Sequence, residues 1–128
     1  TLVMCDIDHF KEVNDEFGHL AGDHVLKEVA QLCKSRIRPD DVIARYGGEE
    51  LALILPETEL AGGVLIADEL RRIIAGTRFA FEDEDIDVTV SCGVAELDLG
   101  WSSYDFVKAA DHQLYEAKRA GRNRVRPQ

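Results

Sequence analysis

The feature that most restricts the fold is a pair of glycines between two apolar runs. VIARY precedes Gly47 and Gly48, and ELALIL follows them after one glutamate. Tight hairpin turns require positive φ angles, which glycine adopts without steric cost. The pattern therefore predicts an antiparallel hairpin over residues 42–55, with Glu49 and Glu50 where its second strand begins.

The rest of the chain alternates between strand and helix patterns. Apolar runs predict strands over 2–8 and 86–97, and RNRV predicts a short closing strand. Helical spacing predicts helices over 9–17, 21–34 and 59–75, and a last helix capped by Ser102 or Ser103 and ended by Gly121. This order predicts an α/β (α+β) fold, in which helices flank a mixed central sheet that contains an antiparallel hairpin.

Length and charge limit the class of protein. At 128 residues, the chain is expected to be one domain over residues 1–128. Because it begins with Thr1 and enters a strand at once, we expect it to be cut from a longer polypeptide. The net charge of −10 argues against DNA or a membrane as a partner, since both are polyanionic.

The three cysteines and the apolar runs indicate a cellular compartment. Cys5, Cys33 and Cys92 lack the spacing of metal ligands, which suits reduced, buried thiols. No apolar run reaches the length of a membrane span. We therefore expect a soluble, cytoplasmic domain, although absent domains could anchor the whole protein.

Acidic residues at strand ends suggest a metal site. Asp6 and Asp8 are two residues apart on a strand, so their side chains share a face and need a cation if buried. Glu49 and Glu50 point to opposite faces, so at most one should join them. Such oxygen ligands suit Mg²⁺ or Mn²⁺. An acidic hairpin tip in solvent and an aspartate that caps the next helix would also explain the pattern.

Cationic and polar residues near the aspartates could bind a nucleotide. The N–H groups at a helix start that includes His9, Phe10 and Lys11 favour anions. Lys118 and Arg122, four residues apart near the end of the last helix, could bind the same phosphates or interact only with the helix dipole.

Asn14 and Asp23 admit two explanations. A carboxamide and a carboxylate together can match the donors and acceptors of a guanine edge. Each residue could instead cap a helix, because both types are favoured at helix starts.

Three separated segments agree with one family. DIDHFKEVNDEFGHLAGD at 6–23, RYGGEEL at 45–51 and AKRAGRNRV at 117–125 resemble, in order and spacing, the GGDEF domain of bacterial diguanylate cyclases. The resemblance implies a fold like that of nucleotidyl cyclases and polymerase palms. It also implies an enzyme that condenses two GTP into cyclic di-GMP and releases two pyrophosphates. Each domain would bind one GTP, so a homodimer would be required.

The resemblance also assigns roles to matching residues. It implies Mg²⁺, or Mn²⁺, ligands from Asp6, the backbone carbonyl of Ile7 and Glu49, and catalytic roles for Glu49, Glu50 and Lys118. GTP would be bound by residues of all three segments: His9, Phe10, Lys11, Asn14, Asp23, Gly47, Gly48, Lys118 and Arg122. Two positions depart from the family name, since Glu49 replaces Asp and Leu51 replaces Phe.

A second motif concerns regulation. Arg38-x-x-Asp41 lies nine residues upstream of Gly47 and resembles the product-inhibition site of the family, where arginine grips cyclic di-GMP by bidentate bonds. RPDD is also an ordinary polar turn. Glu69 stands where some members place a second inhibitor-binding arginine.

Three functions follow as alternatives. The first is an active diguanylate cyclase, and the second is a non-catalytic receptor for cyclic di-GMP or GTP. The third is a cyclase that accepts ATP. The acidic signature and Lys11 argue against the receptor. Asp23 argues for guanine, because members that admit adenine carry serine there.

Overall fold

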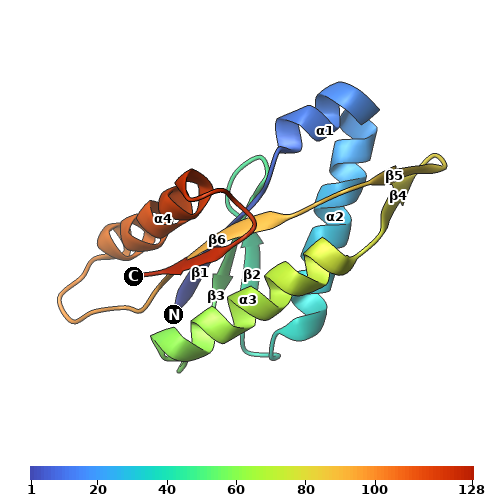
Figure 1. The fold of residues 1–128 in the computed structure, drawn as a ribbon. Helices are drawn as coiled ribbons and strands as arrows, with labels where there is room; N and C mark the ends of the chain where they lie inside the picture. The colour runs from blue at the N-terminus through green and yellow to red at the C-terminus, as the bar shows by residue number, and fades with distance from the viewer.

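The computed structural model describes residues 1–128 and contains two sheets and four helices. The strands are β1 (Leu2–Ile7), β2 (Val42–Arg45), β3 (Glu50–Ile54), β4 (Phe79–Phe81), β5 (Glu84–Ile86), β6 (Val90–Ala95) and β7 (Val125–Pro127). The helices are α1 (Phe10–Phe17), α2 (His19–Arg36), α3 (Leu60–Gly76) and α4 (Ser103–Arg119). Figure 1 shows their arrangement. No helix combines the length and hydropathy that crossing a bilayer would require.

β1 is the central strand of the main sheet, whose order is β2-β3-β1-β6-β7. It pairs antiparallel with β3 and with β6, while β7 adds to β6 in parallel. The predicted α/β class with a mixed sheet and a hairpin is confirmed. The order of the sheet places the C-terminal end of β1 between the β2–β3 hairpin and the segment that enters β6.

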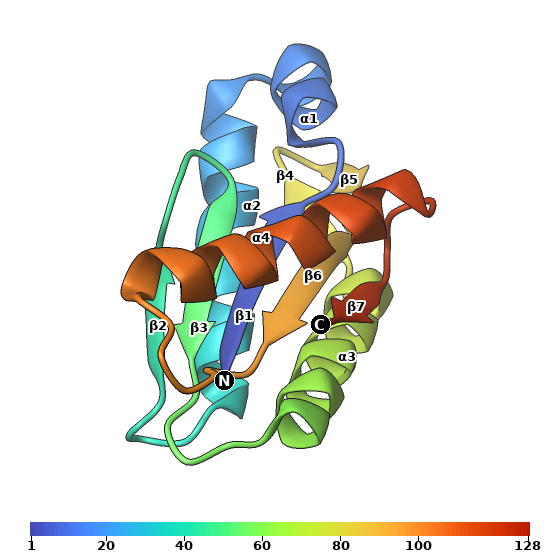
Figure 2. The same cartoon turned by 90° about the vertical axis from the view of Figure 1, so that its left-hand side faces the viewer.

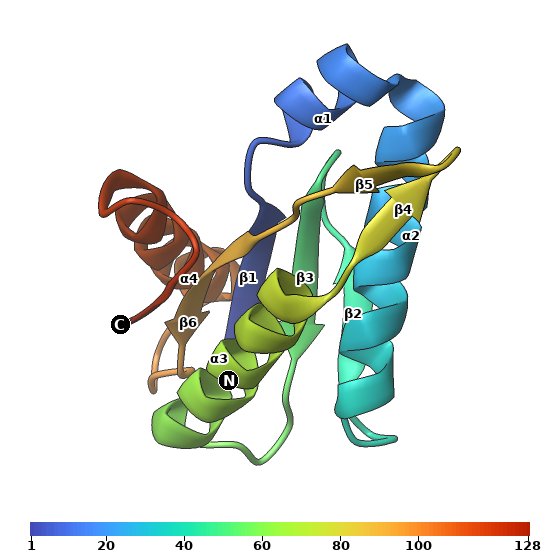
Figure 3. The ribbon, with the colours of Figure 1, turned by 45° about the vertical axis from the view of Figure 1, so that its right-hand side comes forward.

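The side chains of β1 alternate between two cores, as the strand period requires. Val3, Cys5 and Ile7 pack in the larger core with residues of α2 and α3. Leu2 and Met4 pack in the smaller core with residues of α4. Figure 2 shows α4 crossing one face of the sheet, and Figure 3 shows α2 and α3 on the other side.

The predicted hairpin over 42–55 is present, but our reason for it was wrong. β2 and β3 pair antiparallel from Val42↔Ile54 to Arg45↔Leu51. The connection is longer than a two-residue turn, and positive φ occurs at other glycines but not at Gly47 or Gly48. Arg45 instead braces this loop, since its guanidinium donates to the carbonyls of Gly47 (3.1 Å) and Gly48 (2.8 Å).

The strand predicted over 86–97 was placed wrongly at its start. The structure has a separate hairpin, β4–β5, and β6 begins only at Val90. The turn of this hairpin is formed by Glu82 (φ 48°) and Asp83 (φ 66°). Such turns usually carry asparagine or glycine, so the sequence lacked the usual signal.

The last helix begins as predicted and packs very closely on β6. Ser102 caps α4 in a capping box with Asp105. A Cβ atom added to Gly93 would lie 2.1 Å from the carbonyl oxygen of Ala110 and 2.2 Å from the nitrogen of Leu114. The position therefore needs glycine because the helix backbone rests on it.

Replacing Gly93 should separate α4 from the sheet. We expect Gly93→Ala to lower the free energy of unfolding by roughly 2–3 kcal/mol, because overpacking against backbone cannot be relieved by a rotamer change. Urea unfolding would measure this. Gly76→Ala, whose Cβ would meet nothing within 4 Å, is the control. Equal stability of the two variants would contradict the close approach.

Candidate functional site

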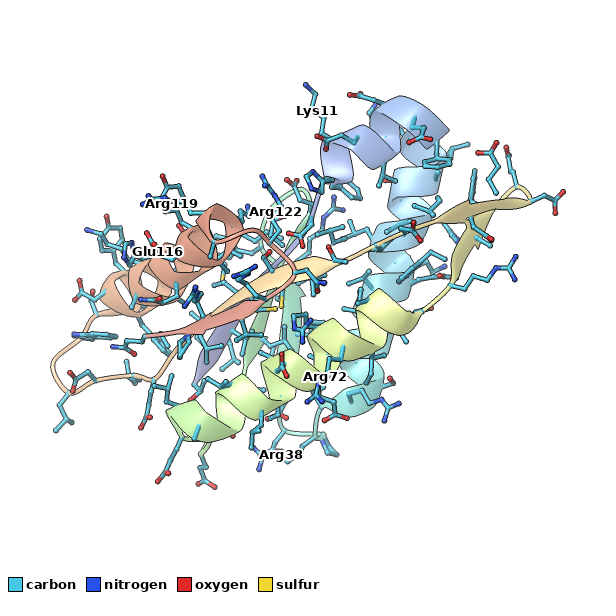
Figure 4. The ribbon with its side chains drawn as sticks, viewed as in Figure 1. Lys11, Arg38, Arg72, Glu116, Arg119 and Arg122 are labelled. Carbon is cyan, nitrogen blue, oxygen red and sulfur yellow. The ribbon has the colours of Figure 1, made fainter.

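A small polar cavity of about 170 Å³ lies at the C-terminal end of β1. Its walls come from the end of β1, the start of α1, the loop before β3 and the segment around the end of α4. Figure 4 shows Lys11 on α1 and Arg122 beyond α4 at this end of the molecule. The lining residues are Asp6, Ile7, Asp8, His9, Phe10, Lys11, Glu12, Glu49, Lys118 and Arg122. The structure thus brings together eight of the predicted site residues from three distant segments.

Asp6 is the buried carboxylate of this cavity and contacts a cation. It is 7% exposed and forms an ion pair with the ammonium group of Lys118. Burial raises the pKa of Asp6, Lys118 acts against this, and the nearby carboxylates of Glu49 and Asp8 add to it. A positive charge beside Asp6 therefore stabilises its ionised carboxylate.

Asp8 behaves differently from Asp6, although both line the cavity. Its carboxylate accepts hydrogen bonds from the hydroxyls of Thr89 and Ser91, each at 2.7 Å, and from the backbone N–H of Asn123 at 3.0 Å. The prediction that both aspartates need a cation was therefore wrong for Asp8. Its negative charge is stabilised by three donors and holds three chain segments together.

Both glutamates of the hairpin approach Asp6, whereas we expected only one. Glu50 is the pairing partner of Asp6 across β1 and β3, so their side chains share a face. Glu49 precedes the strand and lines the cavity from the loop. The alternation rule failed because it applies within a strand, and β3 starts only at Glu50.

Glu50 has a carboxylate neighbour that the sequence analysis missed. Burial, Asp111 and Asp6 raise the pKa of Glu50 to about 6. Its Oε1 atom is buried and has no hydrogen-bond partner. Asp111 lies on α4, seven residues before Lys118, and a spacing of two helical turns could have indicated that both face the sheet.

Two of the predicted phosphate-binding segments contain a residue with left-handed backbone. His9 has φ 55° and joins β1 to α1, which begins at Phe10. Arg122 has φ 64° and follows α4, which ends at Arg119. Arg122 lies beyond the end of α4, so it does not share a helix face with Lys118, but both residues line the cavity.

The residues present fit a divalent cation that is completed by a substrate. No group of three or more His, Cys, Asp or Glu side chains is arranged to hold a metal ion. Asp6 and Glu49 nevertheless offer two carboxylates beside Ile7 in one cavity. Mg²⁺ commonly uses one or two carboxylates and takes its other ligands from phosphates and water. The donor set matches that mode of binding.

Asn14 and Asp23 lie outside this cavity, and Asn14 packs against Gly22, the residue before Asp23. A Cβ on Gly22 would lie 1.8 Å from Oδ1 of Asn14, so the amide of α1 occupies the space above this glycine. Asp23 follows Gly22 and borders a groove of about 490 Å³ between α2 and β2. The capping alternative was wrong, because neither α1 nor α2 has a side-chain cap at its start.

Gly47 and Gly48 lie in the loop between β2 and β3 and do not line the cavity. A Cβ on Gly48 would meet nothing within 4 Å, and one on Gly47 would make only ordinary contact with Glu50. The loop therefore presents open backbone beside Glu49.

Arg38 and Asp41 form a braced turn far from the cavity, as Figure 4 shows for Arg38. The Asp41 side chain is fully buried and accepts from the backbone N–H of Arg38 at 2.8 Å and from its guanidinium at 3.3 Å. The same guanidinium donates to the carbonyl of Pro56 and the hydroxyl of Thr58, both at 2.9 Å. Glu69 lies near this region and is 3.9 Å from Arg36. The motif is thus a turn, whatever else it binds.

The profile of the family described as "Diguanylate cyclase, GGDEF domain" matches residues 1–124. The chain belongs to the GGDEF family. It is 45% identical over 124 residues to diguanylate cyclase DgcP of Pseudomonas aeruginosa. The aligned region covers 97% of this chain and 18% of that relative. The GGDEF chain therefore spans about a fifth of this curated relative and 34% of diguanylate cyclase A of Treponema denticola.

Solved structures agree with this assignment. The GGDEF domain of DgcB from Caulobacter crescentus in complex with c-di-GMP superposes with a TM-score of 0.95 at 39% identity, covering 98% of this chain and 75% of that one. The active GGEEF domain of a diguanylate cyclase from Vibrio cholerae gives 0.90 at 35% identity, covering 98% and 80%. These neighbours confirm the predicted fold.

The raised pKa of Glu50 should make stability depend on pH. The pKa lies above the ordinary value of 4.5, so folding favours the protonated form and stability falls as the pH rises from about 4.5 to about 6. With EDTA present, Glu50→Gln should stabilise the domain at pH 7.5 by about 1 kcal/mol after solvent screening is allowed for. The gain should vanish near pH 4.

Urea unfolding at the two pH values would test this, with Glu16→Gln on the exposed surface of α1 as the control. A gain of the same size at both pH values would show that charge at Glu50 is not its cause.

Proposed function

We propose that residues 1–128 form the catalytic domain of a longer diguanylate cyclase, which condenses two GTP into cyclic di-GMP and releases two pyrophosphates. The observation that carries this proposal is the cavity in which Asp6 and Glu49 meet Lys118 and Arg122. Carboxylates for a cation and cations for phosphates are the two parts that nucleotidyl transfer needs. GTP as substrate would place the domain in the cytoplasm.

Asp6, Glu49 and the backbone carbonyl of Ile7 are the ligands available for Mg²⁺ or Mn²⁺. A bound divalent cation would neutralise phosphate charge and make the phosphorus more electrophilic. Lys118 forms an ion pair with Asp6 in this cavity, so its ammonium group lies beside the carboxylates that would hold the cation. We assign it to the phosphates, where it stabilises charge that develops during transfer.

The phosphates would lie between two cationic groups of residues. On one side, the first N–H groups of α1 after His9 and Phe10, together with Lys11, favour an anion. On the other side, Lys118 and Arg122 face the same cavity. Holding the triphosphate from both sides fixes the α-phosphate for in-line attack.

Glu50 is the group best suited to accept the proton of the attacking 3′-hydroxyl. With its pKa raised to about 6, it is largely ionised near neutral pH but remains a better base than an ordinary glutamate. Asp111 contributes by holding a second carboxylate beside it.

Guanine would be read by Asn14 and Asp23. The carboxylate can accept the N–H groups of a guanine edge, and the amide can donate to its acceptor. Gly22, which precedes Asp23 in the chain, leaves room for the Asn14 amide, because any side chain there would displace it. Gly47 and Gly48 would let backbone lie close to the nucleotide.

Two copies of the domain are needed for the reaction. One cavity supplies ligands for the phosphates of one GTP, and the nucleophile belongs to the GTP of the other copy. The homodimer is therefore part of the proposed active site.

Arg38 and Asp41 are proposed to bind cyclic di-GMP as an inhibitor. A guanidinium fork is suited to a phosphodiester or a guanine edge. Binding would require Arg38 to exchange its bonds with Pro56 and Thr58 for bonds to the ligand. Glu69 would add no positive charge to this site.

Removing the carboxylate of Glu49 should abolish turnover. The nucleotide-free domain at high concentration, incubated with GTP and Mg²⁺, should form cyclic di-GMP that chromatography detects. Glu49→Ala should reduce the rate at least about 100-fold at any Mg²⁺ concentration, because a metal ligand is lost. Glu16→Gln is the control. Product from Glu49→Ala would remove this residue from the metal site, and a wild type that binds cyclic di-GMP without turnover would be a receptor.

Removing the guanidinium of Arg38 should relieve inhibition. We expect Arg38→Ala to raise the inhibition constant of cyclic di-GMP about tenfold or more, as loss of a charge-assisted bond implies, without lowering the initial rate. Arg36→Ala removes the same charge two residues away and should have little effect. An unchanged inhibition constant in Arg38→Ala would leave RPDD as a turn alone.

A further inference from the structure

Three consecutive residues after α4 have left-handed backbone. The φ angles are 122° for Gly121, 64° for Arg122 and 46° for Asn123. Glycine adopts such angles freely and asparagine more readily than most residues, whereas an arginine in this conformation costs about 1 kcal/mol of stability or more. Two such residues in succession persist only when the surrounding structure holds them.

Asn123 is held from two sides by residues of other elements. Its backbone N–H donates to Oδ2 of Asp8 at 3.0 Å, and its Oδ1 accepts from Nη1 of Arg71 at 3.1 Å. Asp8 is fixed by the hydroxyls of Thr89 and Ser91. Asn123 therefore links the end of β1 to α3.

Arg71 is itself held in place on α3. Its side chain is 21% exposed, and its Nε donates to Oδ1 of Asp68 at 2.8 Å. Arg72, labelled in Figure 4, also pairs with Asp68 but forms no hydrogen bond or ion pair with Asn123. The two neighbouring arginines thus share Asp68 as a partner, but Arg71 is the more buried and alone reaches Asn123.

Asn123 adjoins Arg122, a residue of the proposed phosphate site. Arg122 lies between Asn123 and the end of α4, where its backbone N–H donates to the carbonyl of Ala117 at 3.1 Å. With its own N–H bonded to α4 and Asn123 fixed beside it, the Cα–Cβ direction of Arg122 is set toward the cavity that it lines with Asp6 and Lys118.

We propose that Arg71 is a positioning residue for phosphate binding: by holding Asn123, it keeps Arg122 directed into the cavity. Arg71 itself does not line the cavity, so it acts through Arg122. This inference rests on the proposed function, because it takes the phosphates of GTP as the ligand of Arg122.

Binding of GTP with Mg²⁺, measured by calorimetry on the nucleotide-free chain, separates this role from general stabilisation. Arg71→Gln should weaken binding about fivefold, as loss of one hydrogen bond implies, while Arg72→Gln should change it less than about twofold. Both variants should melt at similar temperatures, since each loses one partner of Asp68. Asn123→Gly, which permits the left-handed backbone but removes the acceptor, should match Arg71→Gln.

A double-mutant cycle tests the route through Arg122. If Arg71 acts only by positioning Arg122, then Arg71→Gln should cause no further loss of affinity in an Arg122→Ala background. Additive losses, or equal losses in Arg71→Gln and Arg72→Gln, would overturn the proposal and leave the proposed function standing. A wild type that binds no GTP would overturn both.

Discussion

The buried carboxylate of Asp8 is the interaction on which the arrangement of the site depends. It joins the end of β1 to the entry to β6, more than 80 residues later in the chain, and to the segment after α4, more than 110 residues later. A buried charge without partners costs several kcal/mol. Burial of Asp8 therefore requires donors from the other two segments, which holds the three segments together. The cavity follows from that junction, because Asp6 is two residues before Asp8 on the same face and Arg122 adjoins Asn123.

The two aspartates of β1 therefore divide two tasks that their spacing alone could not separate. Asp8 accepts hydrogen bonds from neutral donors and has a structural role. Asp6 instead forms an ion pair with the ammonium group of Lys118. Lys118 is a flexible side chain that another cation could replace beside Asp6, whereas the three donors to Asp8 are fixed by the fold. Although the chain has a net charge of −10, three cationic side chains line this cavity: Lys11, Lys118 and Arg122.

Periodicity predicted the helices and the two strands of the main hairpin because its signals are local, although the turn chemistry assumed for Gly47 and Gly48 was wrong. Local signals failed where the decisive contact is distant or atypical. The β4–β5 turn of Glu82 and Asp83 contains no glycine, and the donors to Asp8 come from residues that no local pattern connects with it. Asp111 was missed because helical spacing shows which residues share a face, but not that Glu50 lies opposite. The motif residues were singled out from acidic strand ends and helix termini, and a family resemblance then assigned their roles, which remain proposals.

The proposed reaction also explains why a precise cavity and a small domain can coexist. Each chain would have to fix only one triphosphate and one guanine, and the Asp8 junction would support the triphosphate part of that site with residues of a single domain. The second nucleotide would be supplied by another copy, so the cavity need not change shape to be switched on. Because the proposed attack would require two loaded domains in contact, a change in how often the domains meet would be enough to control the rate. Regulation through segments outside the cavity is then compatible with a rigid site.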